Sequence, residues 1–328
     1  MKTLGRILAV IVLVLVALAA VGYLVLKRPD IPYATLEAKY ADGASRYMDL
    51  PGGLHVHYRD QGNAKGPTLV MVHGFSASLA DWEPWVKILG GDYRIISLDL
   101  PGHGLTRAPA GYIPTIDSFA EVADAVPTKL GVSRYVVIGN SMGGLTAWNV
   151  ALRHPEHLDG LVLVDAAGWG HEAQGDKAPV ILRLLQTPVG SALRDLDNRA
   201  LIAQGLKAAF IDPKLVDKAL VDRYSELSRA PGHRDILIHA AAGGRPTATP
   251  QTLAAIKVPT LIMFGEDDRL IPAADGKRFA DAIPGSTLKL YPGVGHVPME
   301  QIPEQSAADL KAWLDAKVYP KVQDKPAA

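Results

Sequence analysis

The chain has no cysteine among its 328 residues. Disulfides, thiolate nucleophiles and zinc–thiolate sites are therefore excluded. An excess of either charge is also missing, because 34 Lys and Arg balance 34 Asp and Glu. Proteins that bind nucleic acids usually carry a basic surplus, so this balance argues against such a function.

Charge is absent from one long stretch near the start, residues 7–26. Its 20 residues match the length that a helix needs to cross a bilayer. We expect residues 1–28 to form a membrane anchor, with the short basic tail inside and the body on the periplasmic side. The alternative is a signal peptide cleaved after Ala17-Leu18-Ala19, which would release a secreted protein. Because the apolar run continues past Ala19 and ends at Lys27-Arg28, the anchor is favoured.

Short apolar runs alternate with helical patterns through most of the remaining chain, and 48% of all residues are hydrophobic. This alternation predicts an α/β fold with a mostly parallel, doubly wound sheet. Strands are expected at 47–50, 54–60, 68–72, 94–98, 135–138, 161–164, 260–264 and 287–291. Helices are expected at 80–89, 116–130 with a kink at Pro127, 141–153, 273–282 and 303–318.

The alternation stops between residues 169 and 257, where no strand pattern occurs. Short helices are expected there at 178–186, 189–196, 198–209, 213–228 and 232–241. An insertion between two strands, at the edge of the sheet where ligands bind, predicts a helical cap. The expected division is an anchor (1–28), a linker (29–44) that begins extended through Pro29 and Pro32, a core in two parts (45–168 and 258–318), the cap (169–257) and a tail (319–328).

A Gly-x-Ser-x-Gly sequence at residues 139–143 follows one predicted strand and opens a helix. This is the context of a nucleophile elbow, a tight turn whose flanking positions must be small. The turn would expose the Ser141 hydroxyl above the sheet. It would also place the Met142 amide at a helix N-terminus, where it can donate to a developing negative charge.

A serine hydroxyl needs a base to take its proton, and the base needs a third group to orient it. An acidic group, Glu266-Asp267-Asp268, comes directly after the strand at 260–264, and His296 follows the strand at 287–291. Both lie at strand ends on the edge of the sheet that also carries Ser141, so these distant residues can meet.

Five sequence motifs occur in one order along residues 45–318, and together they resemble the α/β-hydrolase fold superfamily. They are His73-Gly74-Phe75, Asp99-Leu100-Pro101-Gly102-His103-Gly104, Gly139-Asn140-Ser141-Met142-Gly143-Gly144, Gly265-x-x-Asp268-x-x-x-Pro272 and Gly295-His296-x-Pro298. The resemblance implies Ser141 as nucleophile, His296 as base and Asp268 as acid. It implies an oxyanion hole from the backbone amides of Phe75 and Met142, and neither a cofactor nor a metal.

Residues around these motifs are candidates for the substrate pocket or for other roles. His73, Gly74, Trp169 and Val297 are expected to contact substrate, and His73 and Gly74 also to shape the loop that carries Phe75. Phe75 is expected to line the pocket, and Trp82 either to line it or to pack in the core. Asp165 remains an alternative acid, because it follows the predicted strand at 161–164 and some family members carry their catalytic acid after that strand. Asp99 and His103 are expected to be structural. His55 and His57 are expected to be ordinary strand residues, because a metal pair would need a third ligand.

The identity of the nucleophile limits the reaction. Haloalkane dehalogenases and epoxide hydrolases of this fold carry Asp at the elbow, where this chain has Ser141. Hydrolases that cleave carbon–carbon bonds of ring-fission products share the Asn-Ser-Met-Gly-Gly elbow. They usually have a Trp after the base, where this chain has Val297, and a longer Gly/Pro-rich oxyanion loop. The prediction is an esterase or lipase-like hydrolase of a small, apolar carboxylic ester. Carbon–carbon hydrolysis and non-catalytic ligand binding are the alternatives.

Overall fold

The computed structural model describes the whole chain except residues 1, 171–186, 188–189, 191–192, 243–246 and 321–328. Positions 2–5, 8, 9, 19 and 242 are described by their backbone alone. The predicted helix at 178–186, part of the predicted helix at 189–196 and most of the predicted tail lie outside the described residues.

Eight strands form one sheet in the order β1-β2-β4-β3-β5-β6-β7-β8. β1 and β2 form an antiparallel hairpin, β2 runs antiparallel to β4, and the other neighbours are parallel. The prediction of a mostly parallel sheet is therefore confirmed. The strands are Ser45–Leu50, Leu54–Gly62, Thr68–Val72, Arg94–Leu98, Tyr135–Asn140, Leu158–Val164, Thr260–Gly265 and Thr287–Tyr291.

Helices cover both faces of the sheet, because alternate side chains of the central strands point to opposite sides. Val70 and Val137 pack in one core with α4 (Ile116–Lys129) and α5 (Met142–Arg153). The next residues along the same strands, Met71 and Ile138, pack in a second core with α3 (Glu83–Leu89) and α14 (Pro303–Trp313). The remaining core elements are η1 (Leu79–Trp82), η2 (Pro155–His157), α12 (Ala273–Ala282), α13 (Pro298–Gln301) and η4 (Leu314–Val318).

Several helix boundaries differ from those expected. The predicted helix at 80–89 is a 3₁₀ turn followed by α3, and the one at 303–318 ends as a π-helical turn. Pro127 lies in the last turn of α4, two residues before the helix ends. There it removes one backbone donor, and any distortion can affect only the end of the helix.

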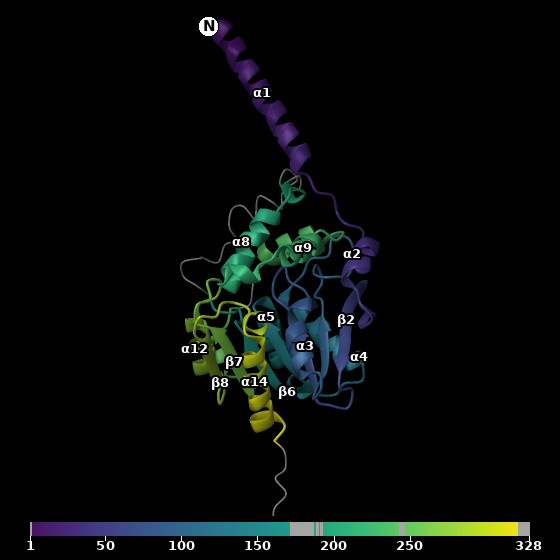
Figure 1. Ribbon diagram of the computed structural model, residues 1–328, viewed down its shortest axis with the longest axis vertical. Coiled ribbons are helices and arrows are strands. Elements are labelled where there is room, and N and C mark those ends of the chain that lie inside the picture. Colours follow the sequence, from purple (N-terminus) through teal and green to yellow (C-terminus); the bar gives the residue numbers. More distant parts are fainter. Residues whose placement is uncertain (1, 171–186, 188–189, 191–192, 243–246, 321–328) are drawn as a thin grey trace, which may run out of the picture.

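The cap lies between β6 and β7 and covers the carboxyl ends of the parallel strands (Figure 1). The predicted helix at 213–228 is split, because Asp217 accepts a hydrogen bond from the Leu220 amide and begins a new helix. The described cap elements are α8 (Arg199–Phe210), η3 (Pro213–Leu215), α9 (Lys218–Leu227), α10 (His233–Ala242) and α11 (Pro250–Leu253).

The predicted linker starts without helix at residues 29–32 and then forms a helix that was not predicted, α2 (Tyr33–Tyr40). Pro32 directly precedes the first turn, a position where proline does not disturb a helix. Leu36 is buried in a small cluster with Leu105 and Leu227, and this packing holds α2 against both core and cap.

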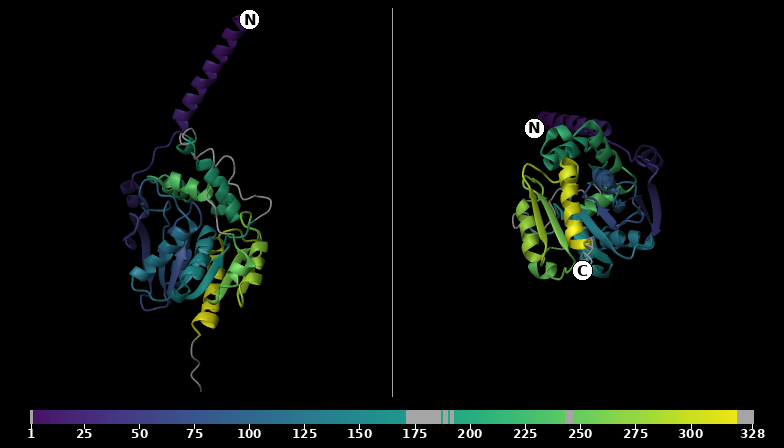
Figure 2. Two further views of the ribbon diagram at one scale, coloured as in Figure 1. Left: turned by 180° about the vertical axis from the view of Figure 1, so that it is seen from behind. Right: turned by 60° about the horizontal axis from the view of Figure 1, so that its bottom comes forward.

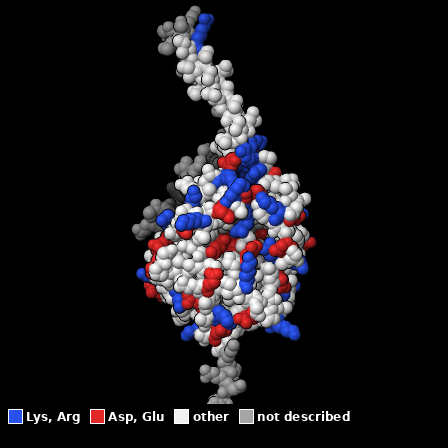
Figure 3. Space-filling view, in the orientation of Figure 1, with Lys and Arg blue, Asp and Glu red and all other residues white. Residues whose placement is uncertain are grey.

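The N-terminal segment forms one helix, α1 (Lys2–Leu26), which projects away from the body (Figures 1 and 2). Figure 3 shows almost no charge along its shaft, whereas both signs are interspersed over the visible face of the body. At its foot, Lys27 and Arg28 pair with Asp195 and Asp197 of the cap. No helix among the described residues meets the combined length and hydropathy requirement for a membrane span, so the predicted transmembrane helix is not supported.

Candidate active site

Ser141 occupies the turn between β5 and α5 in a left-handed conformation, with φ 55° and ψ −117°. Such a backbone costs free energy in a residue other than glycine and persists only where the surroundings enforce it. A side chain at either flanking glycine would clash. A Cβ at Gly139 would lie 2.0 Å from the Gly143 carbonyl oxygen, and one at Gly143 would lie 2.1 Å from that of Val72. The elbow predicted from the motif is therefore present.

His296 and Asp268 form a buried hydrogen-bonded pair, with Nδ1 of His296 2.7 Å from Oδ2 of Asp268. The Asp268 side chain is fully buried, and its other oxygen accepts hydrogen bonds from the Leu270 and Ile271 amides. Glu266 and Asp267 are exposed. Only Asp268 of the three adjacent acids thus faces the histidine, and the pairing leaves Nε2 of His296 as the free ring nitrogen.

The loop after β3 carries the His73-Gly74-Phe75 motif and is held by the histidine. Nδ1 of His73 donates to the Gly74 carbonyl at 2.7 Å, and its Nε2 accepts from the Leu100 amide at 3.0 Å. The imidazole is fully buried and both nitrogens are engaged. His73 therefore shapes the loop, as expected, but it is not among the described residues that line the cavity, where contact with substrate was also expected.

Asp99 and His103 are structural, as expected. Asp99 accepts hydrogen bonds from the Leu79 and Leu105 amides and pairs with Nδ1 of His57 at 2.7 Å. Burial opposes ionisation, but the bonds from His57 and the amides hold the pKa of Asp99 below its usual range. Burial lowers the pKa of His103 well below its usual value, so this imidazole is neutral.

Asp165, the alternative acid, lies beside the pair but bonds differently. Its Oδ1 accepts from the Gly265 amide at 2.9 Å, and its ligand atoms lie within 4.8 Å of those of Asp268 and His296. Burial and the neighbouring Asp268 carboxylate raise the pKa of Asp165 well above its usual value. Asp165 therefore favours its uncharged, protonated form, whereas Asp268 is the acid that is hydrogen-bonded to the histidine.

The Asp165→Asn variant should be more stable than the wild type, and this advantage should grow as pH rises. Because the folded-state pKa is raised, wild-type stability falls from about the unfolded pKa of 3.9 up to the folded pKa, at ~1.4 kcal/mol per unit. Asn keeps an acceptor for the Gly265 amide and does not titrate. Urea unfolding between acid and neutral pH should therefore show a growing advantage for Asp165→Asn. A constant difference across this range would contradict the protonated assignment.

A cavity of about 660 Å³ opens between the sheet edge and the cap, and Ser141 and His296 both line it. Gly74, Phe75 and Val297 line it too, as predicted. Many of the other lining residues are apolar and come from the cap: Leu193, Leu196, Leu201, Ile202, Leu206, Ala209, Phe210, Leu237, Ile238 and Ala241. The volume and apolar character suit a small organic ligand.

Two predicted pocket residues lie elsewhere. Trp169 packs against Phe279 at a ring-centroid distance of 5.5 Å, under the guanidinium of Arg278 at 4.2 Å. It is not among the described residues that line the cavity. Trp82 is fully buried against Trp85 and packs in the core.

Met142 is also buried, and its amide opens helix α5, where backbone N–H groups have no partner inside the helix.

Sequence reasoning missed several groups at the site. Nδ2 of Asn140 donates to the His296 carbonyl at 2.9 Å and ties the elbow to the histidine loop. The His296 amide donates to the Ala209 carbonyl at 2.8 Å, so a cap helix fixes that loop from above. On the cavity wall, Tyr224 of the cap donates to Asp81 at 2.9 Å. Burial raises the pKa of Asp81, although Arg223 opposes this.

Comparison with known proteins places this geometry in a family. The family profile described as "alpha/beta hydrolase fold" matches residues 67–302. A pimeloyl-[acyl-carrier protein] methyl ester esterase of Nitrosomonas europaea is 30% identical over 76% of this chain and 96% of its own length. A 2-hydroxy-6-oxononadienedioate/2-hydroxy-6-oxononatrienedioate hydrolase of Paraburkholderia phymatum is 30% identical over 77% of this chain and 89% of its own.

Solved structures agree with this placement. The crystal structure of a membrane phospholipase A superposes with a TM-score of 0.70 and 26% identity, over 96% of this chain and 99% of that one. The family match covers strands β3 to β8 of the sheet, the elbow, the cap and the loops of Asp268 and His296. The chain therefore belongs to the α/β-hydrolase fold family.

Proposed function

We propose that the chain hydrolyses carboxylic esters through an acyl-enzyme formed on Ser141. The observation that carries this proposal is the His296–Asp268 pair, 2.7 Å apart, whose histidine shares one cavity with Ser141. An activated serine needs such an oriented base. The strained elbow at Ser141 supports the same role, because strain of this kind gathers at active sites.

In the proposed mechanism, Oγ of Ser141 attacks the ester carbonyl carbon while Nε2 of His296 takes the hydroxyl proton. Asp268 keeps the proton of His296 on Nδ1 and stabilises the imidazolium. The amides of Phe75 and Met142 donate to the oxyanion. His296 then protonates the departing alcohol, and finally activates a water that releases the acid and restores the Ser141 hydroxyl.

The charges around the cavity favour an ester over a ring-fission product, which carries carboxylate. Each charged side chain among the described lining residues faces an opposite charge, so none offers a free cation to a substrate anion. The pairs are Asp81–Arg223, Arg194–Asp235, Asp197–Arg28 and Arg234–Asp30. Carbon–carbon hydrolysis remains the competing hypothesis, because the Paraburkholderia phymatum relative bears such a name.

A panel of p-nitrophenyl esters tests the proposal. Because the cavity is apolar, kcat/KM should rise with acyl length beyond acetate, by up to about fourfold for each methylene buried. A 2-hydroxy-6-oxo-dienoate should react at least ~100-fold more slowly than the best ester, since no free cation holds its carboxylate. Faster cleavage of the dienoate would instead identify a carbon–carbon hydrolase. Ser141→Ala provides the blank for both reactions.

We also propose that α1 attaches the chain to a membrane, with the body on the periplasmic side. Two observations support this proposal. Residues 7–26 carry no charge, and large side chains such as Leu13 and Leu24 are 71% exposed, which is unfavourable in water. The similar phospholipase whose structure covers 96% of this chain is described as a membrane protein.

Cell fractionation tests the attachment. The full chain should stay with membranes through high salt and leave only with detergent, whereas a variant lacking residues 1–29 should be in the soluble fraction and active. That truncation keeps Asp30 and its ion pair with Arg234. Release of the full chain by salt alone would contradict the proposal. A mature N-terminus just after Ala19 would show a cleaved signal peptide.

A further inference from the structure

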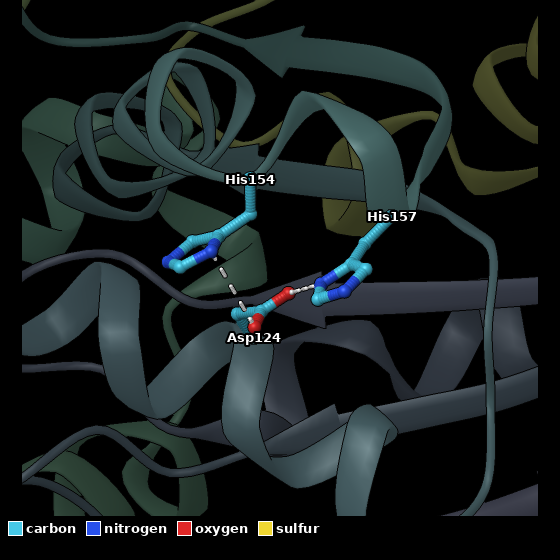
Figure 4. A group of neighbouring side chains, drawn as sticks. All are labelled: Asp124, His154 and His157. Carbon is cyan, nitrogen blue, oxygen red and sulfur yellow. Dashed lines mark hydrogen bonds and ion pairs between the residues drawn. The ribbon is translucent and has the colours of Figure 1, made fainter.

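A second group of titratable side chains lies at the opposite edge of the sheet from Ser141. Asp124 comes from α4, His154 follows the last residue of α5, and His157 ends the turn η2. Figure 4 shows both imidazoles directed at the Asp124 carboxylate between them. Ser141 lies at the carboxyl end of β5, whereas this group lies near Tyr135, where β5 begins, so the two sites are distinct.

The spacing of the three side chains matches a coordination sphere. Their ligand atoms all lie within 4.8 Å of one another. Nδ1 of His157 is 2.7 Å from Oδ1 of Asp124, and Nδ1 of His154 is 3.9 Å from Oδ2. Zinc bonds of 2.0–2.2 Å at tetrahedral angles separate neighbouring ligand atoms by about 3.4 Å. The two observed distances bracket that value, so sub-ångström shifts would let an ion enter.

Surrounding groups orient the ligands. The Tyr135 hydroxyl donates to Oδ1 of Asp124 at 2.7 Å and holds the carboxylate in place. Oε1 of Glu121 lies 3.3 Å from Nε2 of His154 and can accept a hydrogen bond from a proton on that nitrogen. That tautomer leaves a lone pair on Nδ1 facing the Asp124 carboxylate, an arrangement which a cation stabilises. In many metal sites a carboxylate accepts a hydrogen bond from the second nitrogen of a ligating histidine and so fixes its tautomer.

The group is also fixed and accessible. The two imidazole rings are parallel, with centroids 5.9 Å apart and an interplanar angle of 4°. Pro155 and the hydrogen bond from the His157 amide to the His154 carbonyl fix the short connection between them. The His154 and His157 side chains are 21% and 29% exposed, so an ion can reach them from solvent.

From these observations we propose that Asp124, His154 and His157 bind one Zn²⁺ ion. Two imidazole nitrogens and one carboxylate suit zinc, whereas Mg²⁺ and Ca²⁺ prefer oxygen ligands throughout. A water would complete the tetrahedron. Because the ligands come from α4, the end of α5 and η2, the ion would join these elements at the edge of the sheet remote from Ser141 and stabilise the fold.

Zinc titration of the chelator-treated full chain, made without a histidine tag, tests this proposal. Calorimetry should show one Zn²⁺ per chain, and zinc should raise the melting temperature by several degrees. His154→Ala and His157→Ala should each weaken binding at least ~10-fold, since each removes one ligand. The matched control is His55→Ala, which removes a partly exposed histidine 2.6 Å from Asp49 and should leave binding unchanged.

Two further measurements keep the result decisive. Co²⁺ in place of zinc should give the visible absorption of a four-coordinate site in the wild type, and His157→Ala should abolish it. Circular dichroism should show that the variants remain folded. Absence of zinc binding would overturn the proposal. So would binding that survives both substitutions, or binding that is lost only with His296→Ala and therefore belongs to the Asp165–Asp268–His296 group.

Discussion

Ser141→Ala should reduce kcat for a p-nitrophenyl ester by roughly 10⁴–10⁶-fold, because no other hydroxyl is placed on the elbow beside His296. Alanine keeps the Cβ of serine and fits the same left-handed backbone, so no new steric strain arises at φ 55°. The melting curve should therefore stay close to that of the wild type. Steady-state kinetics with matched circular dichroism provide the measurement.

Ser228→Ala is the matched control for that experiment. Ser228 also lines the cavity, but its hydroxyl donates to the Ser225 carbonyl at 2.9 Å and has no described contact with His296. Removal of its hydroxyl should leave most of the activity. If Ser141→Ala kept substantial turnover, or if the two substitutions cost the same, Ser141 would not be the nucleophile.

Asp268→Asn should lower kcat about 10⁴-fold with little change in KM. The Asn oxygen can still accept from the Leu270 and Ile271 amides, so the loop should keep its shape. Its amide group would, however, face Nδ1 of His296 with a donor. The histidine would then carry its proton on Nε2 and could not take one from Ser141.

Asp165→Asn separates this effect from the loss of any nearby carboxyl. Burial and the nearby Asp268 raise the pKa of Asp165 well above its usual value, so an uncharged amide is a close substitute. This variant should retain activity within about threefold of the wild type. A large loss in Asp165→Asn with a mild one in Asp268→Asn would transfer the acid's role to Asp165.

Residues that sit on strand ends could be located from the sequence, because strand order and motif spacing determine which ends meet. Asp268 and His296 were predicted to lie together, and their side chains are hydrogen-bonded. Side-chain direction could not be obtained this way. His73 was expected to face a ligand, yet its ring points back toward Leu100, since the motif locates a residue on a loop without giving its rotamer.

Groups assembled from distant segments were the least predictable. Asp81 and Tyr224 meet across 143 positions of chain, and nothing in either local sequence indicates the other. Helix α2 was missed because its apolar pattern is short and only Leu36 is buried by the body. His154 and His157 have the spacing of a ligand pair in the sequence, but Asp124 lies 30 residues earlier, on another helix.

Covalent labelling with a fluorophosphonate tests the central claim most directly, because such probes react with an activated serine and not with an ordinary hydroxyl. Intact mass should show one adduct per chain, and peptide mapping should place it on Ser141. Labelling should vanish in Ser141→Ala and slow severely in His296→Ala, whereas Ser228→Ala should label at the wild-type rate. An unlabelled wild type, an adduct on another residue, or undiminished labelling of His296→Ala would contradict the account.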